Sequence, residues 1–321
     1  MILTVTINPL LEKRYIYNRT LTEEYDRSWS EELRAGGKGI NVSRQLNRLG
    51  LKNIAFTFLG GNDGKILRDL LFREKINFTF IRTNSGTRNA SVIVDRSNQT
   101  ITTLFGSNSV ITEEEAEEFK TKLEKMIRNC EIVIFSGSSP CETADTIFPF
   151  GIQTANRYDK ISICDTYGEH LRDCIDSAPT IIHNNVEETG KSLKLKLQTE
   201  KEKTDYLDFL YSKNVKQAYL TNGGSESFCS NFDYHFKINP PKINSVDSTG
   251  SGDSFVAGIA FGWHNNLTFE ETLTLATSLG TANSISLETS NVALTEAEKL
   301  RSSIVIEPVG KKMKTVDVTP N

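Results

Sequence analysis

Short apolar runs, rich in β-branched residues, recur along the chain and predict buried strands. Each run has only a few residues and shows no polar alternation, which is typical of strands covered on both faces of a parallel sheet. The runs span residues 2–7, 54–59, 132–135, 161–164, 180–182 and 218–221. We therefore expect a sheet whose strands lie in the interior of the protein.

Segments with helical periodicity lie between these runs. Two of them open with a capping box, Thr112 to Glu115 and Thr268 to Glu271, in which a glutamate follows a threonine three residues later. The acidic run over 113–118 is interpreted as a solvated first helical turn. This alternation of strands and helices predicts an α/β fold: a doubly wound, mostly parallel sheet with helices on both faces, in a single domain over 1–321.

Two stretches, at about 13–34 and 88–106, interrupt this alternation. Residues 90–105 alternate between apolar and polar positions around a polar turn at 96–98, which predicts a β-hairpin. Residues 15–17 could supply a further strand. Because a lone two-stranded unit is marginal in water, we interpret the insertions as a small β-sheet lid that covers either a substrate cleft or a second subunit.

Composition narrows the class of protein. The 321 residues carry 37 Lys and Arg against 41 Asp and Glu, a net charge of −4. No basic stripe is present, which argues against nucleic acid or an anionic membrane as partner. No apolar run approaches the roughly 18 residues of a membrane span, and the first residues resemble a strand rather than a signal peptide. The five cysteines are scattered, which favours reduced thiols and a cytoplasmic protein, and the four histidines lack metal-ligand spacing.

The strongest chemical signal is Asp247-Ser-Thr-Gly-Ser-Gly-Asp253, which precedes a clear helix. A turn of small residues that opens a helix leaves backbone N–H groups unpaired, and these suit a phosphate. A carboxylate at Asp253 would repel such an anion. The conflict disappears if Asp253 accepts a proton from an attacking hydroxyl while the N–H groups hold a transferring phosphoryl group. Alone, the segment fits an ordinary capped helix start equally well.

A second signal is Ala35-Gly-Gly-Lys38-Gly-Ile-Asn41-Val-Ser43, which also leads into a helix. The glycines allow close backbone approach to a ligand, Lys38 adds a point charge, and Asn41 adds an amide. The segment is neither a Walker loop nor a G-x-G-x-x-G motif. By itself it is explained by a tight strand-to-helix turn.

Together, the two segments resemble the two signatures of the PfkB-type, ribokinase-like carbohydrate kinases. Further matches follow in order over about 1–295, and these are Asn8-Pro9, Leu59-Gly-Gly-Asn-Asp63-Gly, Thr87-Arg88, Ser136-Gly-Ser138, Asp165-Thr-Tyr-Gly168, Asn185-x-x-Glu188 and Thr221-Asn-Gly223. The lysine of the glycine-rich segment and the opening Asn-Pro resemble the corresponding residues of the phosphosugar branch of this family, which contains 1-phosphofructokinase and tagatose-6-phosphate kinase.

The resemblance implies an ATP- and Mg²⁺-dependent kinase that acts on a sugar phosphate and pairs as a homodimer through the lid. Fructose 1-phosphate is the first candidate acceptor and tagatose 6-phosphate the alternative. Asp253 would be the catalytic base, with the amides of Gly250, Ser251 and Gly252 as the anion hole. The expected substrate contacts are Glu12, Gly37, Lys38, Asn41, Arg88 and Ser138. The expected ATP contacts are Asn185, Thr221, Gly223, Ser248 and Thr249, and Glu188 would support Mg²⁺ through water.

The sequence also departs from the family pattern. Glu12 replaces the usual Asp, His183 replaces a lysine near the nucleotide phosphates, Glu226 replaces a glycine, and 106–108 replace Pro-Gly-Pro. If His183 faces those phosphates, its charge would aid ATP binding only below about pH 6.5. Two rival functions remain. The first is a kinase for nucleosides or unphosphorylated sugars, which is disfavoured because Lys38 and Arg88 would then face a neutral sugar without an anionic partner. The second is a kinase-like binding protein that senses a sugar phosphate without turnover.

Overall fold

The computed structural model describes residues 1–18 and 27–310. Residues 19–26, inside the first expected lid insertion, and 311–321 lie outside the described residues. In chain order the elements are β1 Ile2–Thr6, β2 Leu10–Tyr17, β3 Ser30–Gly36, α1 Lys38–Arg48, β4 Asn53–Gly60, α2 Gly61–Arg73, β5 Phe78–Thr83, β6 Arg88–Asp95, β7 Thr100–Phe105, α3 Glu113–Arg128, β8 Ile132–Ser136, α4 Glu142–Asp145, α5 Ile147–Arg157, β9 Ile161–Asp165, α6 Leu171–Asp176, β10 Ile181–Asn185, α7 Val186–Leu193, α8 Glu200–Ser212, β11 Gln217–Thr221, β12 Ser227–Asn231, β13 Tyr234–Asn239, α9 Ser251–His264, α10 Phe269–Ser284, α11 Leu294–Glu298, the 3₁₀ turn η1 Arg301–Ser303 and β14 Val305–Val309.

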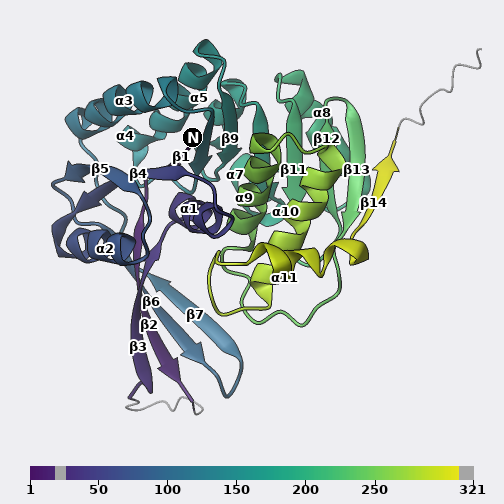
Figure 1. Ribbon diagram of the computed structural model, residues 1–321. Coiled ribbons are helices and arrows are strands. Elements are labelled where there is room, and N and C mark those ends of the chain that lie inside the picture. The colour runs from purple at the N-terminus through teal and green to yellow at the C-terminus, as the bar shows by residue number, and fades with distance from the viewer. Residues whose placement is uncertain (19–26, 311–321) are drawn as a thin grey trace, which may run out of the picture.

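A large twisted sheet forms the centre of the molecule (Figure 1). Within the described chain it has ten strands in the order β14-β13-β12-β11-β10-β9-β8-β1-β4-β5. All pairs from β11 to β5 are parallel, and β12, β13 and β14 add an antiparallel extension. Each predicted apolar run forms one strand of the parallel part, so the mostly parallel sheet is confirmed.

Helices cover both faces of this sheet, as expected for a doubly wound fold. Successive residues of a strand point to opposite faces, so Ile2 of β1 belongs to a core cluster with residues of α1, α9 and α10, whereas Leu3 belongs to another with residues of α3, α5 and α8. The helix pairs α1–α9 and α9–α10 pack against each other on the first face. Burial on both faces explains why the strand sequences are almost purely apolar.

A second, smaller sheet has the strand order β3-β2-β6-β7 and projects from one end of the main body (Figure 1). The predicted hairpin is β6 and β7, paired so that Ala90 faces Phe105. Its turn is closed by Asp95, whose carboxylate accepts bonds from the backbone N–H groups of Ser97 and Asn98. The small sheet is therefore present, and its action as a lid is still a prediction.

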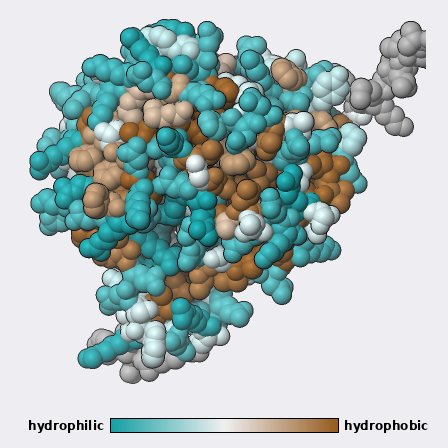
Figure 2. Space-filling model, in the orientation of Figure 1, coloured by the Kyte–Doolittle hydropathy of each residue, from teal (hydrophilic) through white to brown (hydrophobic). Residues whose placement is uncertain are grey.

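The surface is mixed in character. Figure 2 shows a face on which hydrophilic side chains predominate, with hydrophobic patches between them. On the small sheet, Leu33 and Leu104 lie in the same cross-strand row, and therefore on the same face, and are 47% and 57% exposed. No helix of the described residues is long and apolar enough to cross a membrane.

Candidate active site

The candidate site lies at the carboxyl edge of the parallel sheet. Strands β8, β9, β10 and β11 end in polar residues at this edge, which are Ser136, Asp165, Asn185 and Thr221. In doubly wound folds, ligands bind outside the carboxyl ends of the strands. The first turns of α1 and α9 lie close to this edge, since Lys38 contacts Asp165 and His183 packs on Phe255.

The loop before α9 is held in a conformation that only glycine adopts easily. Gly250 has φ +81°, and a Cβ there would lie 2.6 Å from the Ser290 hydroxyl oxygen. Asn283 ties the loop by donating to the Thr249 carbonyl at 2.8 Å and to the Ser251 hydroxyl at 3.1 Å. Sequence reasoning missed Asn283, at the end of α10, and Ser290, in the loop that follows, because single polar residues at such positions carry no distinctive signal.

Helix α9 begins without a capping side chain among the described residues. Its first-turn amides are therefore available for an anion. The Ser251 amide does not fit the expected anion hole, because its N–H already donates to the Ser248 carbonyl at 3.1 Å. In this conformation, the backbone N–H groups of Gly250 and Gly252 are the ones among the three expected amides that could donate to an anion. Ser248 and Thr249 lie in the same loop, and the Thr249 N–H donates to Asp247 at 2.9 Å.

Asp253 lies in the first turn of α9 and is only 4% exposed. Its Oδ2 accepts a hydrogen bond from the Asn41 amide at 2.8 Å. Burial and the nearby charge of Asp165 raise the pKa of Asp253 to about 7, against the opposing effects of Lys38 and of the Asn41 bond. A carboxyl group with this pKa can accept a proton near neutral pH, as a general base must.

Lys38, the first residue of α1, points into a cluster of carboxylates. Its Nζ lies 3.0 Å from Glu188 and 3.7 Å from Asp165, and 4.7 Å from the centre of the Tyr167 ring. Burial alone would lower the pKa of Lys38, but Asp165, Glu188 and Asp253 outweigh it and hold that pKa above its usual range. Lys38 is therefore a fixed positive charge beside the expected base.

Asp165 had no role assigned from the sequence, and the structure places it at the centre of this cluster. Its carboxylate accepts from the Ser136 hydroxyl at 2.7 Å and lies 2.9 Å from His183 Nδ1. Burial opposes ionisation of Asp165, but Lys38 and His183 outweigh that effect and hold its pKa well below the ordinary value. Asp165 is therefore a buried anion that balances Lys38.

His183 does not face a nucleotide cleft, contrary to the conditional expectation for a replacement of the family lysine. It is 2% exposed, and its Nε2 lies 3.1 Å from the Thr221 hydroxyl, while Nδ1 faces Asp165. A Cβ on Gly252 would lie 3.3 Å from His183 Cε1, so the ring sits directly behind the anion-hole loop. The imidazole is shorter than a lysine chain, and its two nitrogens bond within the protein instead of extending into the cleft.

Arg88, Asn8 and Ser138 form a second polar cluster. The Arg88 Nη2 donates to the Asn8 carbonyl at 3.1 Å, and its Nη1 lies 3.4 Å from Asn108 Oδ1. The Asn8 amide donates to the Ser138 hydroxyl at 3.1 Å. Within the described chain, Arg88 Nε and Asn8 Oδ1 are buried without a hydrogen-bond partner. Unpaired buried groups are costly, so this cluster suits a polar ligand, and the guanidinium suits an anion.

Glu12 lies on β2 of the small sheet, and its bonds differ from those of both clusters. Its Oε2 accepts from Arg14 Nε at 3.2 Å, and Arg14 Nη2 donates to Asp247 Oδ2 at 3.3 Å. Arg14 is only 3% exposed, so this link joins the small sheet to the anion-hole loop through a buried ion pair. Glu12 and Asn41 also line a cavity of about 410 Å³.

The expected nucleotide side is partly occupied by internal bonds. Asn185 caps α7 by accepting from the amides of Glu187 and Glu188. A Cβ at Gly223 would meet no atom within 4 Å, so space is open beside this turn. Glu226 lies 3.6 Å from Lys237, at a surface position. Gly37, with φ +120°, is the N-cap of α1 and packs against Pro9.

The residues also permit a test of the expected Mg²⁺. No group of three or more His, Cys, Asp or Glu side chains within residues 1–18 and 27–310 could hold a metal ion. Glu188 is one partly exposed carboxylate at the cleft. This donor set fits Mg²⁺ held through water, because Mg²⁺ retains several waters and rarely uses an all-protein cage.

The fold agrees with the ribokinase-like class that the sequence resemblance implied, and the site places a buried proton acceptor beside a helix start that suits a phosphate. A model of the pfkB family carbohydrate kinases matches residues 14–295. The chain belongs to this family, which confirms the resemblance seen in the two glycine-rich signatures.

Individual relatives agree over nearly the whole chain. Tagatose-6-phosphate kinase from Staphylococcus epidermidis is 28% identical over 309 residues, covering 95% of this chain and 99% of that protein. A possible 1-phosphofructokinase from Thermotoga maritima has a TM-score of 0.88 at 22% identity, over 96% of this chain and 99% of that one. The tetrameric inhibited form of phosphofructokinase-2 from Escherichia coli has a TM-score of 0.85 at 20% identity, over 94% and 98%.

Proposed function

We propose that this chain is an ATP- and Mg²⁺-dependent kinase that phosphorylates a hydroxyl group of a sugar phosphate. The observation that carries the proposal is Asp253: a buried carboxyl with a pKa of about 7, in the first turn of an uncapped helix. A proton acceptor beside unpaired amides has the two functions that phosphoryl transfer to a hydroxyl requires.

A phosphate on the acceptor is supported by the cluster of Arg88, Asn8 and Ser138. Among the described residues, Arg88 Nε is a buried donor without a partner, so an anionic group that accepted from it would remove an energetic cost, while the unpaired Asn8 Oδ1 would need a donor such as a ligand hydroxyl. The relative from Staphylococcus epidermidis is named as a tagatose-6-phosphate kinase, and the protein of similar fold from Thermotoga maritima is described as a possible 1-phosphofructokinase. We propose fructose 1-phosphate, giving fructose 1,6-bisphosphate, as the first acceptor and tagatose 6-phosphate as the alternative.

In the proposed reaction, positioning and charge neutralisation supply most of the rate. Asp253 Oδ1 or Oδ2 accepts the proton of the acceptor hydroxyl, while the amides of Gly250 and Gly252 stabilise charge on the transferring group. Lys38 lies within reach of this charge from the opposite helix. Mg²⁺, when bound, would neutralise the nucleotide phosphates, and Glu188 is the residue that would hold it through water.

The test is an ADP-release assay against fructose 1-phosphate, tagatose 6-phosphate, fructose 6-phosphate, fructose, ribose and nucleosides. Turnover should be confined to phosphorylated sugars. Asp253→Asn should lower kcat by about 10²–10⁴-fold while both ligands still bind by calorimetry, because base catalysis is worth that much. Binding of a sugar phosphate without ADP release by the native protein would instead indicate a sensor. Turnover of fructose as fast as of its phosphate would refute the acceptor assignment.

A further inference from the structure

Arg44, in the middle of α1, has no place in the proposed reaction, yet all three nitrogens of its guanidinium donate hydrogen bonds. Nη1 donates to Asn41 Oδ1 at 2.7 Å, Nη2 to the Ala35 carbonyl at 2.6 Å, and Nε to Glu74 at 2.7 Å. Nη1 also lies 3.4 Å from the Thr289 carbonyl. One side chain thus joins α1 to β3, to the end of α2 and to the loop behind Gly250.

The bond to Asn41 fixes which way its amide points. An amide has one acceptor and one donor end, and the two ends differ in what they can bond. Arg44 can only donate, so it holds the oxygen of Asn41, and the NH₂ group is left to donate to Asp253 at 2.8 Å. The bond from Asn41 to Asp253 is buried, whereas the bond from Arg44 to Asn41 is partly buried beside the cavity that both residues line.

We infer that Arg44 is a positioning residue that keeps the Asn41 NH₂ group on Asp253. It touches neither the expected base nor the reacting atoms and acts through Asn41 alone. If the amide turned over, its oxygen would face the Asp253 carboxylate and repel it. The inference rests on the proposed function only for the consequence in turnover, because the orientation of Asn41 is a property of the protein itself.

The consequence is a change in the ionisation of Asp253. The groups that face it are Asp165 from β9, Lys38 and Asn41 from α1, and Glu188 from α7. Of these, Asn41 and Lys38 favour the carboxylate form. Loss of the Asn41 bond should raise the pKa of Asp253 by about half to one pH unit, since hydrogen bonds to a charged form favour it. The base would then be protonated over more of the neutral range.

The experiment measures the acid limb of kcat/KM for the best sugar phosphate in wild type, Asn41→Ala, Arg44→Met and the double variant. Both single variants should move the limb to higher pH by a similar amount, and the double variant should move it no further. Arg48→Met is the matched control, since Arg48 is exposed on the same helix and should leave the limb in place. The inference would be overturned if the acid limb of Arg44→Met lay at the same pH as that of wild type, or if the double variant moved the limb further than either single variant.

A second readout does not depend on catalysis. The ¹³C carboxyl shift of Asp253, assigned with Asp253→Asn, should titrate at higher pH in Arg44→Met than in wild type. If Asp253→Asn keeps full turnover, the proposed base fails, but this titration still decides the role of Arg44. If Arg44→Met does not fold, Arg44→Lys replaces it. One ammonium cannot serve Asn41 and the Ala35 carbonyl as the guanidinium does, so a smaller shift in the same direction is expected, and no shift would refute the positioning role.

Discussion

Replacing Asp253 by Asn should stabilise the protein in a pH-dependent way. The Asn41 NH₂ group can still donate to the amide oxygen of the variant, so the change removes a charge and keeps the shape. Folding raises the pKa of Asp253 from its ordinary 3.8 to about 7, which means that the folded state disfavours the carboxylate. Removing the group that ionises therefore relieves a cost, and the size of that cost follows from the two pKa values.

The sign and the pH window follow from the direction of the shift. Below pH 3.8 the group is protonated in both states and costs nothing. Between the two pKa values only the unfolded state releases the proton, so the stability of the native protein falls as pH rises. One pKa unit corresponds to about 1.4 kcal/mol. The variant should thus be more stable than wild type by about 2 kcal/mol at pH 5 and by about 4 kcal/mol at pH 8.5.

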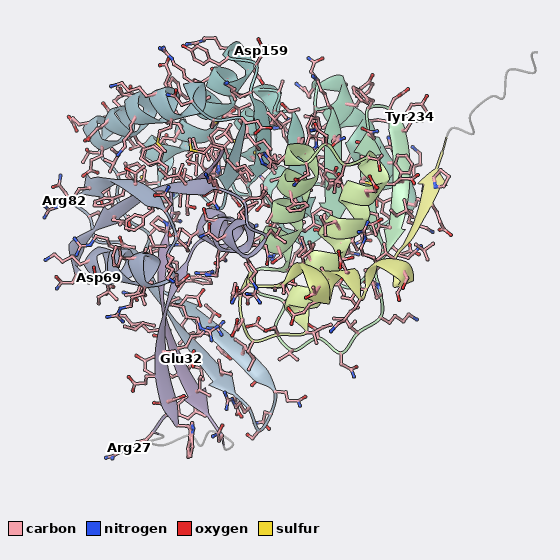
Figure 3. The ribbon with its side chains drawn as sticks, viewed as in Figure 1. Arg27, Glu32, Asp69, Arg82, Asp159 and Tyr234 are labelled. Atoms are coloured by element: carbon pink, nitrogen blue, oxygen red, sulfur yellow. The ribbon has the colours of Figure 1, made fainter. Side chains whose placement is uncertain are left out.

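The assay is urea unfolding of both proteins at these two pH values, with the free energy of unfolding taken from linear extrapolation. Asp69→Asn is the control, because Asp69 projects from α2 at the surface and its side chain is 58% exposed (Figure 3). That variant should differ from wild type by less than about 0.5 kcal/mol at either pH.

A difference that does not grow with pH would refute the reasoning, since it would mean that Asp253 ionises equally easily in both states. A variant less stable than wild type at pH 8.5 would show that the carboxylate makes net favourable contacts. The expected outcome, greater stability with lost turnover, is the trade-off found where an active group is held in an unfavourable setting.

Three further predictions test other parts of the site. Arg14→Met should lower the free energy of unfolding by about 3–5 kcal/mol, because two buried carboxylates lose their shared cation, and a loss below about 1 kcal/mol would contradict this. Arg88→Ala should weaken calorimetric binding of fructose 1-phosphate by about 1.5–3 kcal/mol but not that of fructose; equal losses would show that Arg88 does not bind the phosphate. Ile93→Lys should convert a homodimer to monomers in light scattering, since Val92 is already buried within the protomer. A fully active monomeric wild type would disprove pairing through the small sheet.

The sequence predicted the elements whose signals are local. Helix α3 begins at the Thr112 capping box, where the Glu115 N–H donates to the threonine hydroxyl at 3.2 Å, and α10 begins at the Thr268 box. A third capping box, Thr199 with Glu202, opens α8; it has the same sequence pattern as the other two but was not predicted. Periodicity and capping depend only on residues a few positions apart, so they need no knowledge of tertiary contacts.

The antiparallel strands β12, β13 and β14 were not predicted. Strand β13 is mostly half-buried and begins at the exposed Tyr234, near the edge of the sheet (Figure 3). Its sequence, Tyr-His-Phe-Lys-Ile-Asn, alternates apolar and polar residues and so lacks the continuous apolar run by which the parallel strands were predicted. A half-buried strand near a sheet edge depends on its neighbours for its identity, and those contacts are not visible in a single sequence.

Within the site, the sequence identified residues but not their partners. Arg14 lies in a stretch that looked like a polar insertion, and arginine is almost never fully buried unless paired. The pairing partners are Glu12, two positions away, and Asp247, more than two hundred positions away. Asp165 was matched to a family motif without a role, because its importance comes from the charges that the fold collects around it.

The contacts of Lys38 and Arg88 indicate different roles for these two cations. From the sequence, Lys38 and Arg88 were both expected to hold the acceptor phosphate. In the structure, Lys38 Nζ lies on Glu188 and near Asp165 and contributes to the ionisation of Asp253, whereas Arg88 lies with Asn8 and Asn108. Coulomb attraction falls with distance, so each cation acts mainly on the charge nearest to it. We therefore expect Arg88 to bind the acceptor phosphate and Lys38 to exchange Glu188 for the transferring phosphoryl group. That exchange keeps Lys38 paired with an anion before and after binding, so its partly buried ammonium is never left without a partner.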